Sequence, residues 1–288
     1  MKKYENLILD EERALYAVRG AKIVGCRFAG SKDGESALKE GRNIIVSDCF
    51  FDLRYPLWHT RDAVVENCTM TENCRAALWY DEGVNIRESR LGGIKALREC
   101  RDVRIEKTEI DSPEFGWFCR GVDIRDSSLT AEYAFLESRG LNISELDMRG
   151  KYSFQYVCDA LIQNARLDTK DAFWHSRNVT VENSVLKGEY LGWYSENLKF
   201  VNCKIIGTQP LCYARGLVLE NCEMIDADLA FEFSNVRATL NGTLDSVKNP
   251  ESGRIEVDDI REIILDENMR PDSQCEIICR KTALASGF

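Results

Sequence analysis

Apolar and polar residues alternate in short rows that recur along most of the chain. In RNVTVENS the apolar residues are Val179 and Val181, and ENLKFVNC repeats the pattern with Leu198 and Phe200. Alternation with a period of two predicts a strand with one buried face. Rows of this kind open at Arg19, Arg42, Arg61, Glu82, Arg101, Arg120, Arg139, Cys158, Arg177, Glu196 and Arg215.

The interval between rows predicts a solenoid. The steps are 23, 19 and 21 residues and then 19 throughout. Each interval holds the strand, a turn, a second apolar residue, another turn, and a third stretch that ends in a pair such as Trp174 and His175. Three short strands in so few residues leave no room for a helix but fit one turn of a parallel β-helix. We therefore expect an all-β chain, a single-stranded parallel β-helix with about 11–12 coils of 19 residues, whose rows stack as paired strands.

The repeat covers residues 19–253, and both ends depart from it. We expect one β-helix domain over residues 1–288, in which residues 1–18 form an N-terminal cap and residues 254–288 form a C-terminal cap. Such caps protect sheet edges that would otherwise stay open.

Stacking makes neighbours of residues that hold the same position in consecutive rows. Row-ending asparagines are expected to hydrogen-bond along the stack as an asparagine ladder, and cysteines in the next column are expected to be small buried residues. The asparagines are Asn164, Asn183, Asn202, Asn221 and Asn241, and the cysteines are Cys26, Cys49, Cys68, Cys203 and Cys222.

Several phrases of the sequence resemble a bacterial family of uncharacterised single-stranded right-handed β-helix proteins, similar in architecture to pectin lyases. They are GESALKE (34–40), RYPLWH (54–59), KDAFWH (170–175), GEYLGW (188–193), TQPLCY (208–213), AFEFS (230–234) and KNPESG (248–253). The resemblance implies right-handed coiling and brings no reaction with it.

Composition narrows the expected partners and compartment. A formal net charge of -10 and a pI near 5.0 disfavour unspecific binding to nucleic acid or acidic membranes. Charges interrupt every N-terminal stretch that could serve as a signal segment, and no window approaches a membrane span. We expect a cytoplasmic protein with no nucleic-acid or membrane partner, whose twelve cysteines stay reduced.

All five tryptophans occupy one column when positions are counted backward from the row openings. They are Trp58, Trp79, Trp117, Trp174 and Trp193. If the preceding apolar column faces the core, strand alternation directs the tryptophans outward. Arg98, between Trp79 and Trp117 in the same column, is then placed for cation–π stacking. An outward row of indoles would stack on sugar rings. The alternative is that the indoles pack over the turns of a wide solenoid.

The following column contains both histidines and three carboxylates among aromatic rings. Its members include Glu40, His59, Tyr80, Glu99, Glu137, Tyr156, His175 and Tyr194. Glu99 and Glu137 are two coils apart, about 9.5 Å at the strand spacing, which is near the carboxylate separation of inverting glycoside hydrolysis. Glu40 beside His59 is a second possible acid–base pair.

Arginines open three consecutive rows at Arg101, Arg120 and Arg139. Like charges on neighbouring strands call for counter-charges, so the alternative role of Glu99 and Glu137 is to pair with these arginines. The same arginines could instead bind a uronate or another anionic sugar through bidentate contacts.

No metal or cofactor site is expected. His59 and His175 are six coils apart, about 29 Å, so they cannot share a metal ion. The sequence has no Gly-rich phosphate loop, CxxC pair or calcium-loop spacing. The grouped aspartates of polygalacturonases and the Arg-Pro motif of pectate lyases are also missing.

The leading functional hypothesis is a carbohydrate-binding or carbohydrate-modifying protein. Its ligand, an oligosaccharide or sugar-like small molecule, would lie along the Trp, Tyr and His face. A glycoside hydrolase or polysaccharide lyase-like activity is compatible with these residues, although they identify no reaction. The alternative is a non-catalytic scaffold whose aromatic face contacts another protein or a second copy of the chain.

Overall fold

Consecutive coils pair in parallel, as the row pattern predicts. A computed structural model describes residues 1–30 and 35–281. β13 (Arg101–Glu106) pairs in parallel with β16 (Arg120–Thr130), with Val103 opposite Val122. The predicted all-β parallel β-helix is confirmed. Among the described residues, no helix is both long and apolar enough to cross a membrane.

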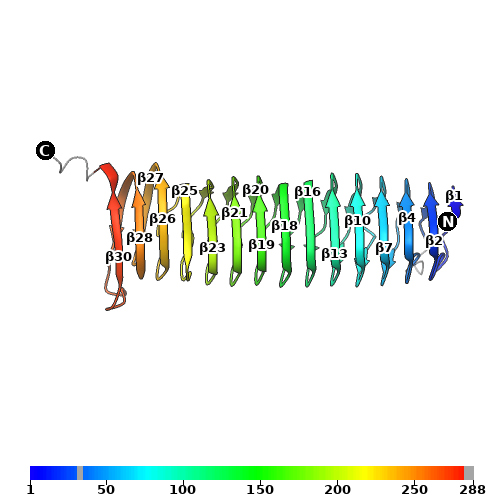
Figure 1. Ribbon diagram of the computed structural model, residues 1–288, viewed down its shortest axis with the longest axis horizontal. Helices are drawn as coiled ribbons and strands as arrows, with labels where there is room; N and C mark the ends of the chain where they lie inside the picture. Colours follow the sequence, from blue (N-terminus) through cyan, green and yellow to red (C-terminus); the bar gives the residue numbers. More distant parts are fainter. Residues whose placement is uncertain (31–34, 282–288) are drawn as a thin grey trace. The chain divides into compact units, whose positions relative to one another are not determined.

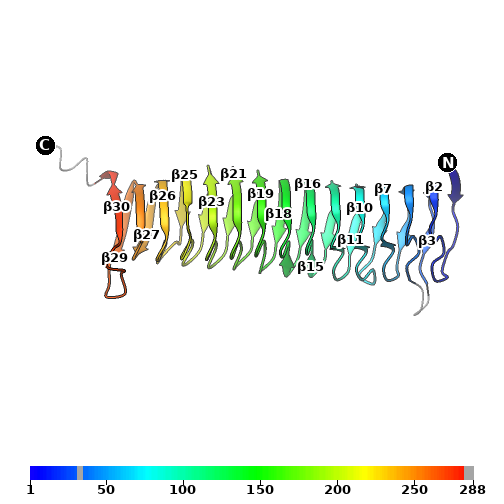
Figure 2. The same ribbon diagram turned by 60° about the horizontal axis from the view of Figure 1, so that its bottom comes forward.

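Residues Met1–Arg149 form one compact unit, called here the N-terminal unit. Its longer strands lie side by side in Figure 1: β1 (Lys2–Glu5), β2 (Arg19–Val24), β4 (Arg42–Ser47), β7 (Arg61–Glu66), β10 (Glu82–Arg87), β13, β16 and β18 (Arg139–Arg149). The second face of each coil carries β3 (Arg27–Phe28), β5 (Phe50–Phe51), β8 (Thr69–Met70), β11 (Arg90–Gly92) and β14 (Glu109–Asp111). The third face carries β6 (Leu57–Trp58), β9 (Leu78–Trp79), β12 (Leu97–Arg98), β15 (Glu114–Phe115) and β17 (Tyr133–Ala134). In the turned view of Figure 2, β11 and β15 come into sight.

Residues Gly150–Phe288 form the C-terminal unit, which is described as far as residue 281. Its first face carries β19 (Cys158–Gln163), β21 (Arg177–Glu182), β23 (Glu196–Val201), β25 (Leu217–Ile225), β26 (Asn235–Asn241), β28 (Ser252–Val257) and β30 (Gln274–Cys279). The remaining strands are β20 (Arg166–Asp168), β22 (Val185–Lys187), β24 (Lys204–Ile206), β27 (Thr243–Lys248) and β29 (Asp259–Ile264).

The terminal segments contribute strands as well. β1 lies within residues 1–18 and pairs in parallel with β2, while β30 lies within residues 254–288 and pairs in parallel with β28. The protein therefore has about 14 turns, more than the 11–12 coils counted from the rows. Residues 31–34, which include the start of the GESALKE phrase, and residues 282–288 of the predicted C-terminal cap lie outside the described part of the chain.

The interior of each unit is built from columns of apolar side chains. Phe28 stacks on Phe51 with ring centroids 4.8 Å apart, and Phe154 stacks on Phe173 at 5.0 Å. All four rings are fully buried, because apolar residues at one position of successive coils meet across the parallel strands.

The cysteines of these columns are free thiols. Cys26, Cys49, Cys68, Cys203 and Cys222 are all buried and form no disulfide. Cys74 shows what burial does to such a group: desolvation raises the pKa of its thiol to about 11. The five buried column thiols serve as small groups of the core, as expected from the sequence.

Left-handed backbone conformations mark the corners of the coil. Asn183, Asn202 and Asn221 all have φ between 50° and 53°, a region that asparagine tolerates well. Their side chains bond along the stack: the Nδ2 of Asn202 donates to the Oδ1 of Asn183 at 3.0 Å, and Asn221 donates to Asn202 at 2.8 Å. Asn241 extends the chain of bonds by donating to Asn221 at 2.7 Å.

Candidate ligand-binding groove

The candidate site lies at the corner where the third face of one coil leads into the first face of the next. The short strands β6, β9 and β12 place Trp58, Trp79 and Arg98 at equivalent positions. The residue after each of these turns the chain with a positive φ: 56° at His59, 56° at Tyr80 and 54° at Glu99. A left-handed conformation costs an ordinary residue about 1–2 kcal/mol. The aromatic and charged residues at this corner therefore occupy a backbone conformation that is unfavourable for them.

The indoles of the tryptophan column cover one another. Trp58 and Trp79 stack with centroids 5.2 Å apart, and in the C-terminal unit Trp174 and Trp193 stack at 5.4 Å. The Nζ of Lys39 lies 3.6 Å from the ring of Trp58, over its face. All five tryptophans are half-buried. Their faces therefore meet neighbouring side chains, which leaves mainly their edges for a ligand.

Hydrogen bonds also fix several indoles. The Nε1 groups of Trp117, Trp174 and Trp193 donate to the backbone carbonyls of the residues 16 positions later, at 3.0, 2.7 and 2.8 Å. The buried Nε1 groups of Trp58 and Trp79 have no hydrogen-bond partner among the described residues. Arg98 has its guanidinium carbon 6.0 Å from the ring of Trp79, as the sequence predicts, and its second aromatic contact is Phe118 at 5.8 Å.

The next column reaches the solvent in both units. In the N-terminal unit Tyr80 is 42 % exposed and Phe118 is 37 % exposed. In the C-terminal unit five rings follow one another: four are stacked at centroid distances of 4.9, 5.1 and 4.8 Å, and the fifth is tilted against the fourth at 5.8 Å. We call these five residues the aromatic ladder: Tyr156, His175, Tyr194, Tyr213 and Phe233. Predicted site residues Tyr156, His175 and Tyr194 are thus brought together.

A groove of about 430 Å³ opens beside this column in the N-terminal unit. It is lined by His59, Arg61, Tyr80, Asp81, Glu82, Glu99, Arg101, Phe118 and Arg120. Five of these were candidates from the sequence, namely His59, Tyr80, Glu99, Arg101 and Arg120. The groove thus combines exposed aromatic rings, an imidazole, carboxylates and guanidinium groups on one surface.

Glu99 is held as a carboxylate within the groove. Burial alone would raise the pKa of Glu99, but hydrogen bonds from Tyr80 and Arg98 outweigh it and keep the pKa below its ordinary value. Arg98 Nε donates to Glu99 Oε1 at 2.9 Å. The hydrogen bond to Glu99 in turn raises the pKa of the Tyr80 phenol, which stays neutral. Glu99 therefore pairs with Arg98 rather than with Arg101, the partner expected from the sequence alternative.

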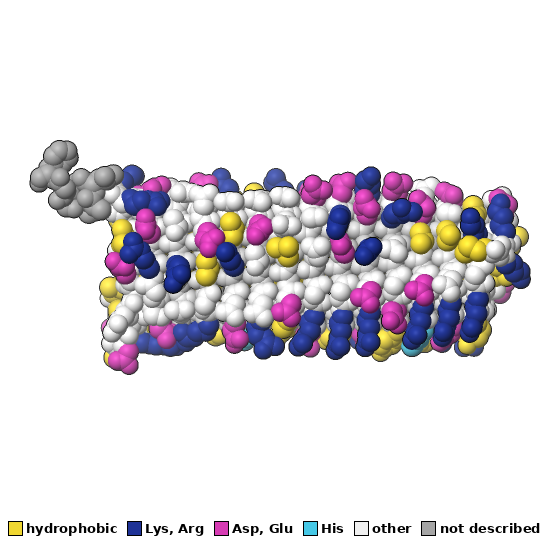
Figure 3. Space-filling view, viewed as in Figure 1, with side chains coloured by type: hydrophobic (Ala, Val, Ile, Leu, Met, Phe, Trp, Pro, Cys, Tyr) yellow, Lys and Arg dark blue, Asp and Glu magenta, His cyan; other side chains and the backbone are white. Residues whose placement is uncertain are grey.

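The arginines beside the groove differ in how they are paired. Arg61 lies 3.6 Å from Glu82 on the next coil. Arg101, Arg120 and Arg139 follow on consecutive coils, with Arg101 opposite Arg120 and Arg120 opposite Arg139. All three are exposed and form no ion pair with any described residue. We call these three residues the arginine row, and Figure 3 shows the Lys and Arg side chains along this edge of the N-terminal unit.

Asp81 lies at the inner side of the same corner. It is only 1 % exposed, and burial raises the pKa of its carboxyl well above the ordinary value. Equivalent positions on other coils carry Thr60, Cys100 and Ser138. Asp81 therefore replaces a small residue in the wall between the groove and the core.

The remaining predicted residues lie away from the groove. Glu137 and Glu40 belong to the N-terminal unit but do not line it, and His175 belongs to the aromatic ladder of the C-terminal unit. Glu40 and His59 are column neighbours, as expected, since Glu40 N donates to the Trp58 carbonyl of the next coil at 2.9 Å.

Phe118, Arg61, Glu82 and Asp81 line the groove without having been singled out from the sequence. The row alignment already placed Phe118 in the column of Tyr80, and Arg61 and Glu82 in the column of Arg101. A search for the charged and aromatic members of adjacent columns would have found them. For Asp81 the signal is an acidic residue in a column of small ones.

Among the described residues, no cluster of three or more His, Cys, Asp or Glu side chains could hold a metal ion.

The sequence also matches a known family. The family described as "Protein of unknown function (DUF3737)" aligns with residues 2–278. The chain belongs to this family. No curated protein matches the sequence.

Solved structures of similar form are distant from this DUF3737 member. PfbA, a surface adhesin of Streptococcus pneumoniae, is 10 % identical, with 80 % of this chain and 76 % of that chain covered and a TM-score of 0.39. The A-module of the Azotobacter vinelandii mannuronan C-5 epimerase AlgE4 is 14 % identical, with 83 % and 89 % covered and a TM-score of 0.36. The periplasmic alginate epimerase AlgG is 7 % identical, with 92 % and 73 % covered and a TM-score of 0.30. Likenesses this distant say nothing about the ligand or the reaction of this chain.

Proposed function

We propose that the chain binds an oligosaccharide or a sugar-like small molecule in the groove of the N-terminal unit. The observation that carries the proposal is the combination of exposed ring surface with hydrogen-bonding groups on one hollow. Tyr80 and Phe118 offer apolar rings, and His59, Glu99 and the guanidinium groups surround them. Sugars are bound by this mixture, because their C–H faces pack on aromatic rings while their hydroxyls need donors and acceptors.

The pairing within the groove supports a preorganised site. Glu99 is fixed by Arg98, and Tyr80 is fixed both by Glu99 and by the ring of His59, whose centroid lies 5.1 Å away. Side chains that are already ordered lose less conformational entropy when a ligand binds. His59 and Glu99 also place an imidazole and a carboxylate on either side of Tyr80, which are the groups that acid–base chemistry on a bound sugar would use.

Isothermal titration with a panel of neutral and anionic oligosaccharides tests the proposal. Tyr80→Ala should weaken binding about tenfold, because stacking area and a hydrogen bond are lost together. Tyr194→Ala is the matched control, since Tyr194 holds the same column position in the C-terminal unit with 44 % exposure and a φ of 58°. Absence of binding to every sugar, or equal loss in both variants, would contradict the proposal.

A second candidate function is self-association through the aromatic ladder. Tyr156 and Tyr194 remain 49 % and 44 % exposed although their faces are stacked, so the ladder presents a strip of ring edges to solvent. Exposed aromatic strips are common at protein interfaces. Light scattering should then detect a dimer that Tyr156→Ser dissociates and Tyr80→Ser leaves intact, whereas a monomer at all concentrations would exclude this function.

A further inference from the structure

The arginine row is an unusual arrangement for an acidic protein. Arg101, Arg120 and Arg139 face one another directly across paired strands, and none has an ionic partner in the part of the chain that the structure describes. Like charges directly opposite each other on neighbouring strands destabilise a sheet. Arg42 likewise stands opposite Arg19 and Arg61 on earlier coils of the same column. Other arginines of the unit are paired across strands: Arg87 lies 3.3 Å from Glu66, and Arg90 lies 3.7 Å from Glu109.

Glu82 lies at the end of the arginine row that is nearest to Tyr80. It precedes Arg101 in the same column and pairs with Arg61 on its other side, at 3.6 Å. Arg61 and Glu82 therefore balance each other near His59 and Tyr80, while the positive charge accumulates from Arg101 onward. The groove is consequently neutral at one end and cationic at the other.

We infer that the groove's ligand is a linear anionic chain whose acidic groups, carboxylates or sulfates, lie on successive coils against Arg101, Arg120 and Arg139. Guanidinium groups bind such anions through paired N–H donors, and stacked strands repeat these donors at intervals of about 4.8 Å along the row. A ligand with a single charge would leave two of the three arginines without a partner. A chain with regularly repeated charges satisfies all three.

The inference rests on the proposed sugar-binding function and adds the charge and the repeat of the ligand. At the neutral end, Tyr80 and Phe118 receive the ring of a sugar unit, and the cationic end receives the acidic units that follow it. Because the arginines are exposed, we expect their replacement to relieve repulsion and to leave the fold intact.

The test compares an oligouronate with its carboxyl-reduced counterpart of the same length, with a sulfated oligosaccharide and with a single-stranded oligonucleotide. The double variant Arg101→Gln with Arg120→Gln should bind the oligouronate about twentyfold more weakly, and each single variant about fivefold more weakly. Arg87→Gln with Arg90→Gln is the control, because it removes the same charge from the same unit at arginines that are already paired. Wild-type binding should also weaken as salt is raised.

The possible results distinguish a failure of the anionic-ligand inference from a failure of the sugar-binding function on which it rests. Tighter binding of the oligouronate or of the sulfated sugar than of the reduced sugar supports the inference and identifies the acidic group, provided that the arginine-row variants weaken this binding and the Arg87 and Arg90 double variant does not. Equal binding of charged and reduced sugars overturns the inference while the sugar-binding function stands. Binding of the oligonucleotide alone overturns both. A melting temperature of the double variant that is not lower than that of the wild type shows that any loss of binding is not a loss of folding.

Discussion

The backbone N–H of Thr60 donates a hydrogen bond of 2.7 Å to Oδ1 of Asp81 on the next coil, while Oδ2 of Asp81 has no partner among the described residues. At the equivalent corner three coils later, Ser138 Oγ accepts the N–H of Cys119 at 2.9 Å. The single oxygen of a serine is thus enough to accept the backbone N–H at this corner. The aspartate adds a second oxygen, which has no hydrogen-bond partner in the core. Such a group is costly, above all when it is ionised.

Asp81→Ser should therefore stabilise the protein near neutral pH, by about 1–2 kcal/mol. Because burial raises the pKa of Asp81 in the folded state, the folded chain retains a proton that the unfolded chain has lost. The contribution of Asp81 to stability is then greatest at pH values below about 4 and falls as the pH rises through the folded pKa. Urea denaturation at several pH values should show this slope in the wild type and a flatter one in Asp81→Ser and Asp81→Asn. A steeper slope in the variants would refute the assignment.

Trp193→Ala should cost about 3 kcal/mol of unfolding free energy, because the indole loses its stacking on Trp174 and its hydrogen bond to Gln209. Tyr194→Ala, one residue later and more exposed, should cost about 1 kcal/mol. Guanidinium denaturation followed by circular dichroism measures both values. Equal costs for the two variants would mean that the tryptophan column contributes no more to stability than the exposed column beside it.

Asn221 offers a way to separate a hydrogen bond from a backbone conformation. Its amide bonds to Asn202 and Asn241, and its φ is 53°. Asn221→Gly removes the amide but tolerates this φ, whereas Asn221→Ala removes the amide and strains the backbone as well. We expect a loss of about 1 kcal/mol for glycine and about 2 kcal/mol for alanine, measured by thermal unfolding. If alanine were no worse than glycine, the corner would not depend on the left-handed conformation.

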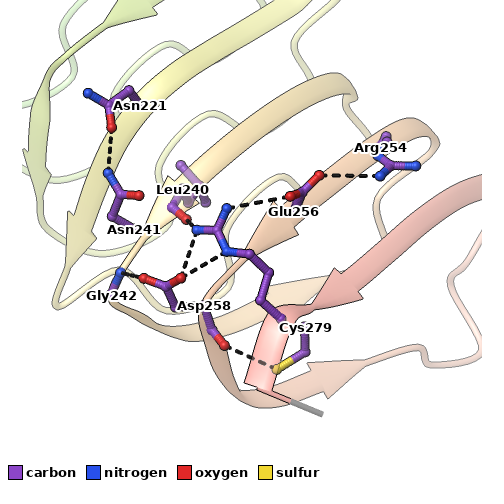
Figure 4. A network of polar contacts seen from close by, with 9 residues as sticks. Asn221, Leu240, Asn241, Gly242, Arg254, Glu256, Asp258 and Cys279 are labelled. Carbon is purple, nitrogen blue, oxygen red and sulfur yellow. Dashed lines mark hydrogen bonds and ion pairs between the residues drawn. The ribbon is translucent and has the colours of Figure 1, made fainter. Parts of the chain in front are cut away.

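Arg280 connects the last described coil to the coils before it, and Figure 4 labels its partners Leu240, Glu256 and Asp258. Its Nε donates to Asp258 at 2.8 Å, and its Nη2 donates to the carbonyl of Leu240. Arg280→Gln should let β30 open more often, so its amides should exchange with deuterium about tenfold faster while those of β25 stay unchanged. Lys281→Gln is the control, since the Lys281 side chain is more exposed and its ammonium group pairs with Asp259. Similar protection of β30 in all three proteins would show that Arg280 is not the anchor.

The buried positions of the coils could be predicted from the sequence, because burial follows strand alternation. Val179, Val181 and Leu198 are fully buried, and each belongs to an apolar position of its row. β30 escaped notice because QCEIIC lacks the turn residues that open and close the other rows. Its pairing with β28 depends on backbone groups, which carry no sequence signature.

The arrangement of the outward side chains was harder to predict, since a column assignment says which residues are neighbours but not how their rings are oriented. Trp58 and Trp79 were placed correctly in one column, yet strands in register bring their faces together instead of opening them to a ligand. Likewise, the two-residue spacing of Glu99 and Arg101 suggested a pair, whereas the adjacent Arg98 reaches the carboxylate first. Pairing between long side chains depends on rotamers, which one-dimensional spacing does not determine.

Arg101 stands opposite Arg120 and Arg120 opposite Arg139, so each coil contributes one arginine to the row. A whole coil is therefore a unit that can be duplicated or deleted. Duplication or excision of one complete turn would lengthen or shorten the cationic strip by a single arginine and leave every other column aligned. Turns of 19, 21 and 23 residues all keep the columns in register, so a turn can also gain residues without shifting the columns that follow. Evolution can thus adjust the reach of this surface in discrete steps, without redesigning the interior.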